Sequence, residues 1–394
     1  MMKRKGNIII LMIILVMTFT SCGNKPVATD ATEGNEPVST DGTKTAFGIT
    51  PLGEKQILRV AYFAGSPHAN TFYVAEQKGF FKELNIEIEY LPIVNGPAMM
   101  EAYTSWDIGT TGGPGVIVGA LAHGVKMIGV SDYEENLALF VRKDSAIYKS
   151  GKGNVPSTPD LYGKAEDWKG TKWLYPAGTN LHLVLVSALK KQGLALGDIS
   201  SVNMDVTSAL TAFKGGQGDG LAVWNAFAFA AEDAGFKRVS DAGKQGDINV
   251  CGLVATEDAL ENKRELIKKA WQVYYNTVEW SKSSPQNLQS SVDYYVESCD
   301  EQGILITEDI AKRALEYYKA PSLKENIDIM TKEVVDKEGK YTKRKLLQAE
   351  NELNYTLDFF ISQGNYTEED RNKILDNKLV DNSITLEVKD ELDK

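Results

Sequence analysis

The amino-acid sequence predicts an α/β protein with two lobes, and three features of the chain lead to this prediction. Short runs rich in β-branched and aromatic residues alternate with helix-like apolar runs between residues 57 and 145. The same alternation returns between residues 171 and 241, after a segment rich in Gly, Lys, Pro and Ser at 149–159. Alternation of this kind is typical of a mainly parallel sheet with helices on its faces, so each series predicts one lobe.

The first series begins at residues 57–63, whose β-branched and aromatic content predicts a strand. Residues 71–84 carry apolar side chains at a helix-compatible spacing. Residues 86–93 alternate apolar and polar side chains, as a half-buried strand does. By the same criteria we expect further strands at 107–111, 125–132 and 137–145, and further helices at 98–106 and 115–124.

The second series repeats this order. A strand at 171–178 leads into a turn and then into an amphipathic helix at 181–193, which Gly193 closes. We expect the remaining strands at 200–206, 220–224 and 236–241, and the remaining helices at 208–216 and 226–235.

Helical patterns dominate from residue 257 onward, including the segments 263–283 and 346–364. These segments are too apolar to stay in solvent, so we expect them to pack on the first lobe. The predicted division is therefore lobe 1 at 55–146 and 244–386, lobe 2 at 147–243, and a charged, frayed tail at 387–394.

The N-terminus has the pattern of a secretory signal. Lys3, Arg4 and Lys5 precede a short apolar run, which is shorter than the roughly 20 residues that span a bilayer. Ser21 and Cys22 resemble a bacterial lipobox, in which the cysteine is acylated. Residues 23–54 are poor in large apolar residues and predict a flexible tether. We expect a lipoprotein signal peptide at 1–22 and a lipid-anchored protein on the extracytoplasmic face of the cell membrane; the alternative is secretion with an incidental Cys22.

The net charge of −11 argues against a nucleic-acid partner, which would need a basic face. Cys251 and Cys299 form one disulfide or are both buried as free thiols, and the sequence does not decide between these alternatives.

Motifs for catalysis and metal binding are missing from the sequence. The histidines are His68, His123 and His182, and no two of them have metal-ligand spacing. The sequence contains neither a G-x-S-x-G elbow nor a phosphate-binding G-x-x-x-x-G-K loop. We therefore expect no enzyme activity, no cofactor and no metal.

Several segments together resemble a known family. In chain order they are FYVAEQKGFFKELNIEIE, NGPAMMEAY, DIGTTGGPGVIVGALAHG, LFVRKDS, DWKGTKWLYPAGTNLHLVLVSALKKQGL and GGQGDGLAVWNAFAFAAEDAG. Between about residues 59 and 388 the chain is similar to the nitrate-, sulfonate- and taurine-binding proteins of ABC importers and their thiamine-precursor-binding relatives. The resemblance implies a two-lobed, type II periplasmic-binding-protein-like fold with the ligand cleft between the lobes. It also implies a monomeric solute-binding component that works with a membrane permease and its ATPase.

Ligands of open α/β sheets bind beyond the carboxyl ends of the strands, where helix N-termini offer unpaired N–H groups and a positive partial charge. Within the resemblance, the turns at these places are candidate ligand contacts, although the same residues often only cap helices or pack. The candidates are Ser66, His68, Asn70, Gly96, Thr111, Gly112, Gly113, Tyr133, Gly178, Thr179, Asn180, His182, Trp224 and Asn225.

The candidate turns lack an obvious Arg or Lys, which suits a small anion held by helix ends, such as a sulfonate, taurine or nitrate. The alternative ligand is a neutral heteroaromatic molecule such as a thiamine-precursor pyrimidine, which Trp224 would stack on. A lower alternative is a membrane-tethered sensor without transport.

Overall fold

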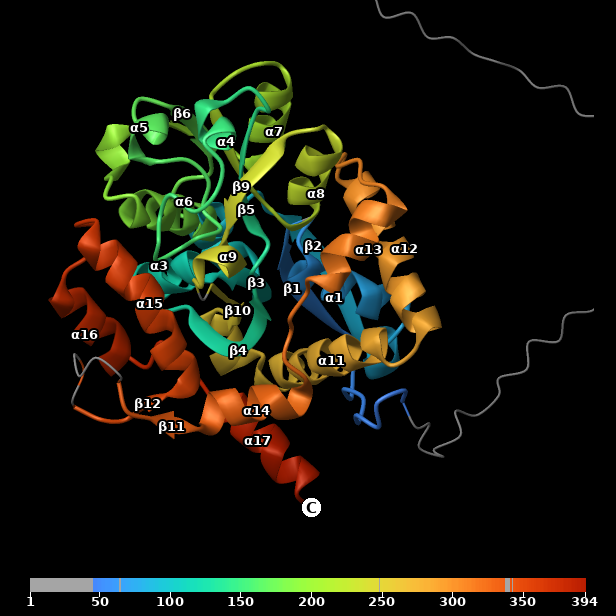
Figure 1. Cartoon of the computed structure of the whole chain (residues 1–394). Helices are drawn as coiled ribbons and strands as arrows, with labels where there is room; N and C mark the ends of the chain where they lie inside the picture. The colour runs from blue at the N-terminus through green and yellow to red at the C-terminus, as the bar shows by residue number, and fades with distance from the viewer. Residues whose placement is uncertain (1–44, 64, 248, 337–340, 342) are drawn as a thin grey trace, which may run out of the picture. The chain divides into compact units, whose positions relative to one another are not determined.

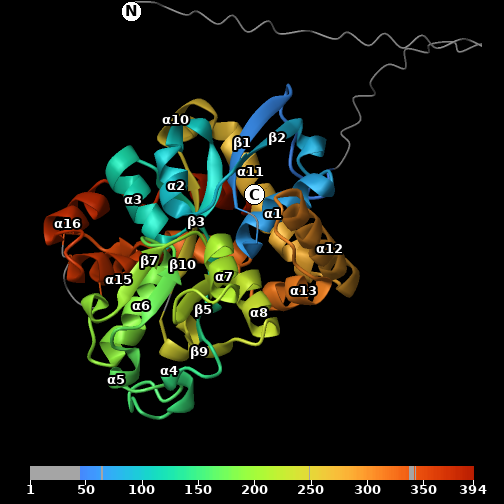
Figure 2. The ribbon, with the colours of Figure 1, turned by 90° about the horizontal axis from the view of Figure 1, so that it is seen from above.

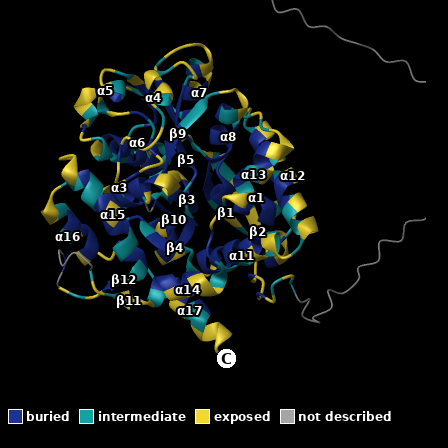
Figure 3. Cartoon of the chain, in the orientation of Figure 1, coloured by how far each residue is buried: buried dark blue, intermediate teal, exposed yellow. Residues whose placement is uncertain are grey.

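The computed structural model describes residues 45–63, 65–247, 249–336, 341 and 343–394. Within these residues the strands form two five-stranded sheets and a small hairpin, with helices packed around the sheets (Figure 1). The sheets lie in the buried interior, and most exposed residues lie on the outer helices and loops (Figure 3). The predicted signal peptide, Cys22 and most of the predicted tether lie outside the described residues.

The first sheet has the strand order β2-β1-β3-β10-β4. Strand β1 pairs in parallel with β2 and β3, whereas β10 lies antiparallel between β3 and β4. The sheet is therefore mixed rather than mainly parallel, because β10, which the sequence did not indicate, returns from the second lobe. The bounds are β1 Gln56–Tyr62, β2 Ile86–Pro92, β3 Ile108–Gly112, β4 Lys126–Tyr133 and β10 Val250–Ala255.

The second sheet has the order β7-β6-β8-β5-β9 and is also mixed. Strand β6 pairs in parallel with β7 and β8, and β5 lies antiparallel between β8 and β9. Because β5 belongs to this sheet, the chain crosses between the sheets at 134–136, and the boundary expected after residue 146 is too late. The bounds are β5 Leu137–Val141, β6 Lys172–Tyr175, β7 Ser200–Asn203, β8 Gly220–Trp224 and β9 Lys237–Asp241.

The longer helices of both lobes follow the carboxyl ends of strands (Figures 1 and 2). Helix α6, for example, buries Leu181, Val184, Leu185 and Ala188 against the second sheet. In the first lobe the helices are α1 Pro67–Gln77, α2 Gly96–Glu101 and α3 Gly113–His123. In the second they are α4 Ala146–Lys149, α5 Ala165–Trp168, α6 Asn180–Lys191, α7 Val206–Lys214, α8 Asn225–Asp233 and α9 Ala242–Gln245. Short 3-10 turns cover Lys82–Leu84, Tyr103–Ser105 and Leu196–Asp198.

The C-terminal part is helical, as the sequence predicted, and packs mainly on the first lobe. Trp271 on α11 donates a hydrogen bond to the carbonyl of Ile128 at 2.8 Å. Helix α13 also packs on α8 of the second lobe through Ile310 and Ala311. The elements are α10 Glu257–Asn262, α11 Arg264–Lys282, α12 Pro285–Glu301, α13 Glu308–Glu316, α14 Leu323–Thr331, β11 Glu333–Val334, β12 Leu346–Leu347, α15 Gln348–Ser362, α16 Glu368–Asp376 and α17 Ser383–Leu392.

Residues of both segments that were predicted to be flexible belong to the folded structure. Residues 45–54 belong to the first lobe, because Ile49 and Leu52 are buried in its core and Leu52 bonds to the carbonyl of Leu84 at 3.1 Å. The predicted tail at 387–394 is mostly helical, since α17 continues to Leu392. Its Glu387 bonds to Arg264 on α11 at 2.5 Å.

Asp107 precedes β3 and links three segments of the first lobe. Its fully buried carboxylate accepts hydrogen bonds from the guanidinium of Arg59 at 2.6 Å and from Lys263 at 2.9 Å. Burial alone would raise the pKa of Asp107, but its hydrogen bonds to Arg59 and Lys263 outweigh burial and hold the pKa below its usual value.

Cys251 and Cys299 are both free and buried, so of the two alternatives left open by the sequence the structure shows the buried thiols. Across the described residues, no helix combines the length and the hydrophobicity that a membrane span requires.

Candidate functional site

A cavity with an empty volume of about 400 Å³ lies between the two lobes, at the carboxyl ends of the strands. Both lobes contribute to its wall, the first through the loops after β1 to β4 and the second through the loops after β6 and β8. The lining residues are Phe63, Ser66, His68, Asn95, Gly96, Pro97, Thr111, Gly112, Pro114, Gly115, Glu134, Gly178, Thr179, Asn180 and Trp224.

Four long helices begin at this cavity, and none of them has an N-cap hydrogen bond from a side chain. Ser66, Gly112, Thr179 and Trp224 are the N-cap residues of α1, α3, α6 and α8, and none makes a side-chain cap hydrogen bond. The Thr179 hydroxyl instead donates to the carbonyl of Pro176 at 2.8 Å. The first N–H groups of these helices therefore lack the side-chain acceptor that usually satisfies them, which leaves donors for a bound molecule.

Glu134 is the acidic residue of the cavity wall and lies in the first crossover between the sheets. Its carboxylate accepts hydrogen bonds from the side-chain amides of Asn180 at 2.9 Å and Asn225 at 3.2 Å. Its backbone N–H donates to the carbonyl of Asn249 in the second crossover at 2.9 Å. Burial raises the pKa of the Glu134 carboxyl, and the amide donors oppose this shift.

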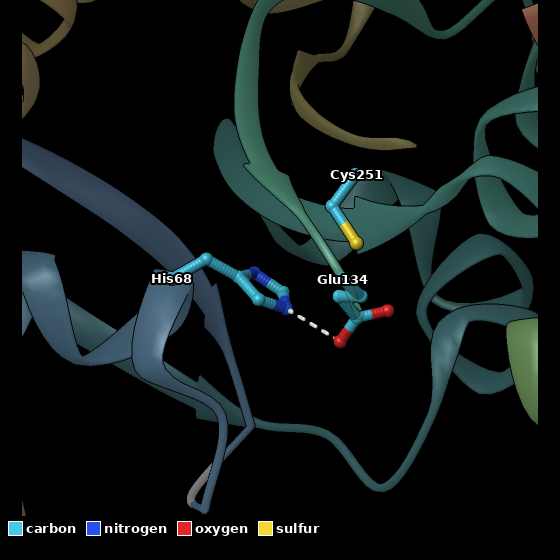
Figure 4. A group of neighbouring side chains, drawn as sticks. All are labelled: His68, Glu134 and Cys251. Carbon is cyan, nitrogen blue, oxygen red and sulfur yellow. Dashed lines mark ion pairs between the residues drawn. The ribbon is translucent and has the colours of Figure 1, made fainter. Parts of the chain in front are cut away.

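His68 lies in the first turn of α1 and points toward Glu134 (Figure 4). Its Nε2 lies 2.6 Å from the hydroxyl of Ser66 and 3.9 Å from Oε1 of Glu134. This separation would allow an ion pair, yet burial lowers the pKa of His68 to about 3, so we treat the imidazole as neutral. The hydroxyl and the carboxylate face the same ring nitrogen, whereas a Ser-His-acid triad needs them on opposite nitrogens.

Cys251 on β10 completes a buried group with His68 and Glu134 (Figure 4). One ligand-type atom from each residue lies within 4.8 Å of the other two. The Cys251 thiol lies 3.7 Å from the amide nitrogen of Asn180. Burial, together with the nearby charge of Glu134, raises the pKa of the Cys251 thiol well above its usual value.

Three polar atoms of the cavity wall have no hydrogen-bond partner among the residues that the structure describes. They are Nδ1 of His68, Oγ1 of Thr111 and Oδ1 of Asn180, and all three residues are buried. A buried polar atom without a partner costs about 1–3 kcal/mol. A bound polar molecule would remove this cost, so the wall is suited to a ligand with both donors and acceptors.

The cavity also has flat apolar walls. Phe63 and Trp224 line it from opposite lobes, and both also line a wider groove with an empty volume of about 1020 Å³. The groove therefore adjoins the cavity, and the two aromatic side chains lie where one meets the other.

Most of the candidate residues from the sequence come together in this wall. Those that line the cavity are Ser66, His68, Gly96, Thr111, Gly112, Gly178, Thr179, Asn180 and Trp224.

Five candidates do not line the cavity. Asn70 lies on α1, is buried toward α12 and accepts a hydrogen bond from Ser298 at 3.1 Å. Tyr133 lies at a different groove and donates to Glu352 at 2.8 Å. The remaining three have structural positions: Gly113 packs against Thr356, His182 accepts from the backbone N–H of Gly178, and Asn225 supports Glu134 from behind.

Glu134 is the most important residue that the sequence analysis missed. It stands in the run Asp132-Tyr133-Glu134-Glu135-Asn136, which has the composition of a solvated loop. Phe63, Asn95, Pro97, Pro114 and Gly115 were also missed, although they flank predicted turns.

Comparisons with known proteins agree with this architecture. The family model described as NMT1/THI5 like matches residues 66–288, more than half of the chain. A protein of Brachyspira hyodysenteriae named as an ABC transporter periplasmic binding protein is 30% identical over 196 residues, which cover 49% of this chain and 54% of that protein. The alignment thus spans about half the length of this curated relative.

Solved structures show the same fold. The alkanesulfonate-binding protein SsuA from Xanthomonas axonopodis, bound to MOPS, matches with a TM-score of 0.59 at 16% identity, over 80% of this chain and 95% of that chain. The periplasmic nitrate-binding protein NrtA from Synechocystis matches with a TM-score of 0.60 at 12% identity, over 87% and 90%. The chain has the two-lobed fold of periplasmic binding proteins and belongs to the NMT1/THI5-like family.

Proposed function

We propose that this protein is the extracytoplasmic solute-binding component of an ABC importer. It holds a small solute in the cavity between its lobes and delivers the solute to a membrane permease that a cytoplasmic ATPase drives. The protein acts as a monomer that a lipid on Cys22 anchors to the cell membrane. The family match, the fold and the names of the relatives support this class of function.

One observation carries the proposal: the interlobe cavity combines four uncapped helix starts with three buried polar atoms that lack partners within the described part of the chain. Burying these polar groups without partners costs free energy unless a polar molecule occupies the cavity. The solute leaves unchanged in this proposal, because the Cys251 thiol is protonated and the neutral His68 has no acid on Nδ1 among the described residues, so neither group is activated for attack.

For the solute, Glu134 favours the heteroaromatic alternative over the small anion. Among the described residues that line the cavity, none is Lys or Arg, and Glu134 is buried beside neutral amides. An anion about 4 Å from this carboxylate would be repelled by about 4 kcal/mol at an effective dielectric constant of about 20. A flat molecule with N–H donors, such as an aminopyrimidine, would instead donate to Glu134 and stack on Trp224.

The small anion is the competing proposal, and the helix starts support it. The N-terminal ends of α1, α3, α6 and α8 carry positive partial charge toward the cavity. SsuA and NrtA, which share the fold, are named for alkanesulfonate and nitrate binding. An anion would fit this cavity only with Glu134 protonated, so its affinity would rise as the pH falls.

Isothermal titration calorimetry of the full chain separates these proposals. The probes are 4-amino-5-hydroxymethyl-2-methylpyrimidine, taurine, ethanesulfonate and nitrate. We expect the aminopyrimidine to bind and the anions to bind weakly at neutral pH. Tight binding of an anion alone would reject the heteroaromatic class, and binding of no probe would reject both classes.

A pair of neighbouring variants tests the site. Thr110 and Thr111 are both fully buried, and their hydroxyls have no partner among the residues described, but only Thr111 lines the cavity. We expect Thr111→Val to weaken solute binding by about 5- to 10-fold, the effect of one lost hydrogen bond of about 1 kcal/mol. Thr110→Val is the matched control and should leave the affinity unchanged. Equal effects of the two variants on the affinity would mean that the solute does not contact Thr111 in this cavity.

A further inference from the structure

We propose that His68, Glu134 and Cys251 bind a divalent transition-metal ion of the Zn²⁺ class at the inner end of the cavity. The three residues come from distant parts of the chain: the start of α1, the first crossover and strand β10. Local spacing in the sequence therefore could not reveal them. The metal site goes beyond solute capture, and its test does not need the solute.

The geometry is close to that of a metal site. The three ligand atoms lie within 4.8 Å of one another, and Nε2 of His68 is 3.9 Å from Oε1 of Glu134. Ligands at about 2.0–2.3 Å from a tetrahedral ion stand roughly 3.3–3.8 Å apart. A contraction of up to about 1.5 Å between the ligand atoms, through rotation of their side chains, would complete the coordination.

The ligand chemistry selects the class of ion. One imidazole, one carboxylate and one thiolate form a borderline-to-soft set, which suits Zn²⁺ or Co²⁺. Mg²⁺ and Ca²⁺ prefer oxygen ligands, which only Glu134 offers in this group. Binding forms a bond from the ion to Sγ of Cys251 while the thiol proton leaves to solvent.

Charge in this part of the molecule also favours a cation. Asp132 lies two residues before Glu134 and is buried as well, and Cys251 lies near both carboxyls. Among the described residues of the cavity wall, no Lys or Arg compensates Glu134, whereas the charge of Lys282 acts on Asp132 from outside the cavity. An ion at this place would balance the buried carboxyl of Glu134, which has no cationic Lys or Arg beside it among the described residues of the cavity wall.

Binding of the ion has identifiable costs. Coordination through Nε2 would break the hydrogen bond between His68 and Ser66. The positive ends of the nearby helices disfavour a cation. Coordination bonds from the thiolate, the imidazole and the carboxylate would offset these costs.

The remaining coordination position would face the cavity. His68 and Glu134 line the cavity, whereas Cys251 lies in the sheet behind them. Water, or a nitrogen or oxygen atom of a solute, would complete the ion, as in zinc sites with three protein ligands. The ion would thus add a positive charge to a cavity wall that otherwise presents a carboxylate.

Cobalt titration tests the proposal on the full chain in detergent, after removal of bound metals by a chelator. We expect Co²⁺ to give a near-ultraviolet thiolate-to-cobalt absorption band that saturates at one ion per chain and disappears on addition of Zn²⁺. Cys251→Ser should remove the band. Cys299→Ser is the matched control, because Cys299 is also free and fully buried but lies on α12 in a different core cluster, together with residues of α13.

His68→Asn provides a second, independent variant. We expect it to weaken Zn²⁺ binding by more than about 100-fold, since even outer-shell changes cost 10- to 100-fold. Circular dichroism confirms that each variant is folded; if Cys251→Ser does not fold, His68→Asn decides. The proposal is overturned if wild type gives no band, if the band persists in Cys251→Ser, or if Cys299→Ser removes it equally.

Discussion

Replacing Glu134 by Gln should change the solute preference of the cavity in a direction that identifies the solute. The carboxylate accepts from Asn180 and Asn225 and lines the cavity, so it is available to a solute donor. A hydrogen bond to a charged group contributes about 1.5–3 kcal/mol. Its loss should weaken binding of an aminopyrimidine by about 10- to 150-fold.

The same substitution should have the opposite effect on an anion. Removing the charge removes a repulsion of about 4 kcal/mol, so sulfonate or nitrate should bind more tightly to Glu134→Gln at neutral pH. The fold should tolerate the change, because Oδ1 of Asn180 has no partner in the described part of the structure. After rotation of the Asn180 side-chain amide, this oxygen can accept a hydrogen bond from the new amide of residue 134. We expect the stability to change by no more than about 1 kcal/mol.

Calorimetry on chelator-treated protein measures both effects without a contribution from metal. The matched control is Glu135→Gln, which removes the same charge from the next residue. The Glu135 side chain is 43% exposed, and its carboxylate pairs with the Lys319 ammonium at 2.6 Å, outside the cavity. Unchanged affinity for every solute in Glu134→Gln, or equal changes in both variants, would refute a role for this carboxylate in recognition.

Three further predictions concern the wall and the scaffold. Trp224→Leu should weaken binding of an aromatic solute by about 2- to 10-fold, because stacking contributes about 0.5–1.5 kcal/mol, and should abolish the solute-dependent quenching of tryptophan fluorescence. Gly115→Ala should reduce solute affinity, since its Cβ would lie 2.2 Å from Oγ1 of Thr111, whereas Gly197→Ala, which has open space, serves as the control. Asp107→Asn should cost about 3 kcal/mol of unfolding free energy at pH 7 in urea denaturation. Because the folded pKa of Asp107 is depressed, its contribution is complete above about pH 4 and is lost as the pH falls through the folded value, so the two proteins should converge in acid.

The fold was largely predictable because each lobe repeats strand and helix with clear apolar periodicity. Nearly all expected strands and helices of the two lobes occur within a few residues of their predicted bounds. Strand β10 was missed because Val250–Ala255 is a single short apolar run beside a helical region. Its antiparallel pairing with β3 and β4 depends on the chain returning from the second lobe, which no local pattern shows.

The candidate site was predictable only where a general rule of α/β folds applies. Turns after parallel strands meet at one edge, so Ser66, Thr111 and Thr179 were expected together and do line one cavity. Glu134 and Glu135 show the limit of such reasoning. They are adjacent and chemically alike, yet one is buried in the cavity wall and the other pairs with Lys319 at the surface.

Glu134 also connects the solute with the arrangement of the two lobes. Its backbone bonds to Asn249, so both crossovers meet at this residue, and its side chain holds the first residues of α6 and α8 in the second lobe. Moving the second lobe away would therefore remove both amide donors from a buried carboxyl, at a cost of about 1.5–3 kcal/mol for each hydrogen bond to the charged group. A solute that donates a hydrogen bond to Glu134 would stabilise the closed arrangement of the lobes through the same carboxylate that connects them. Asn225→Ala removes one of these hydrogen bonds without changing a residue of the cavity wall. We expect it to lower the solute affinity, because the closed arrangement of the lobes becomes less stable. Small-angle scattering of this variant should then show a more open average form.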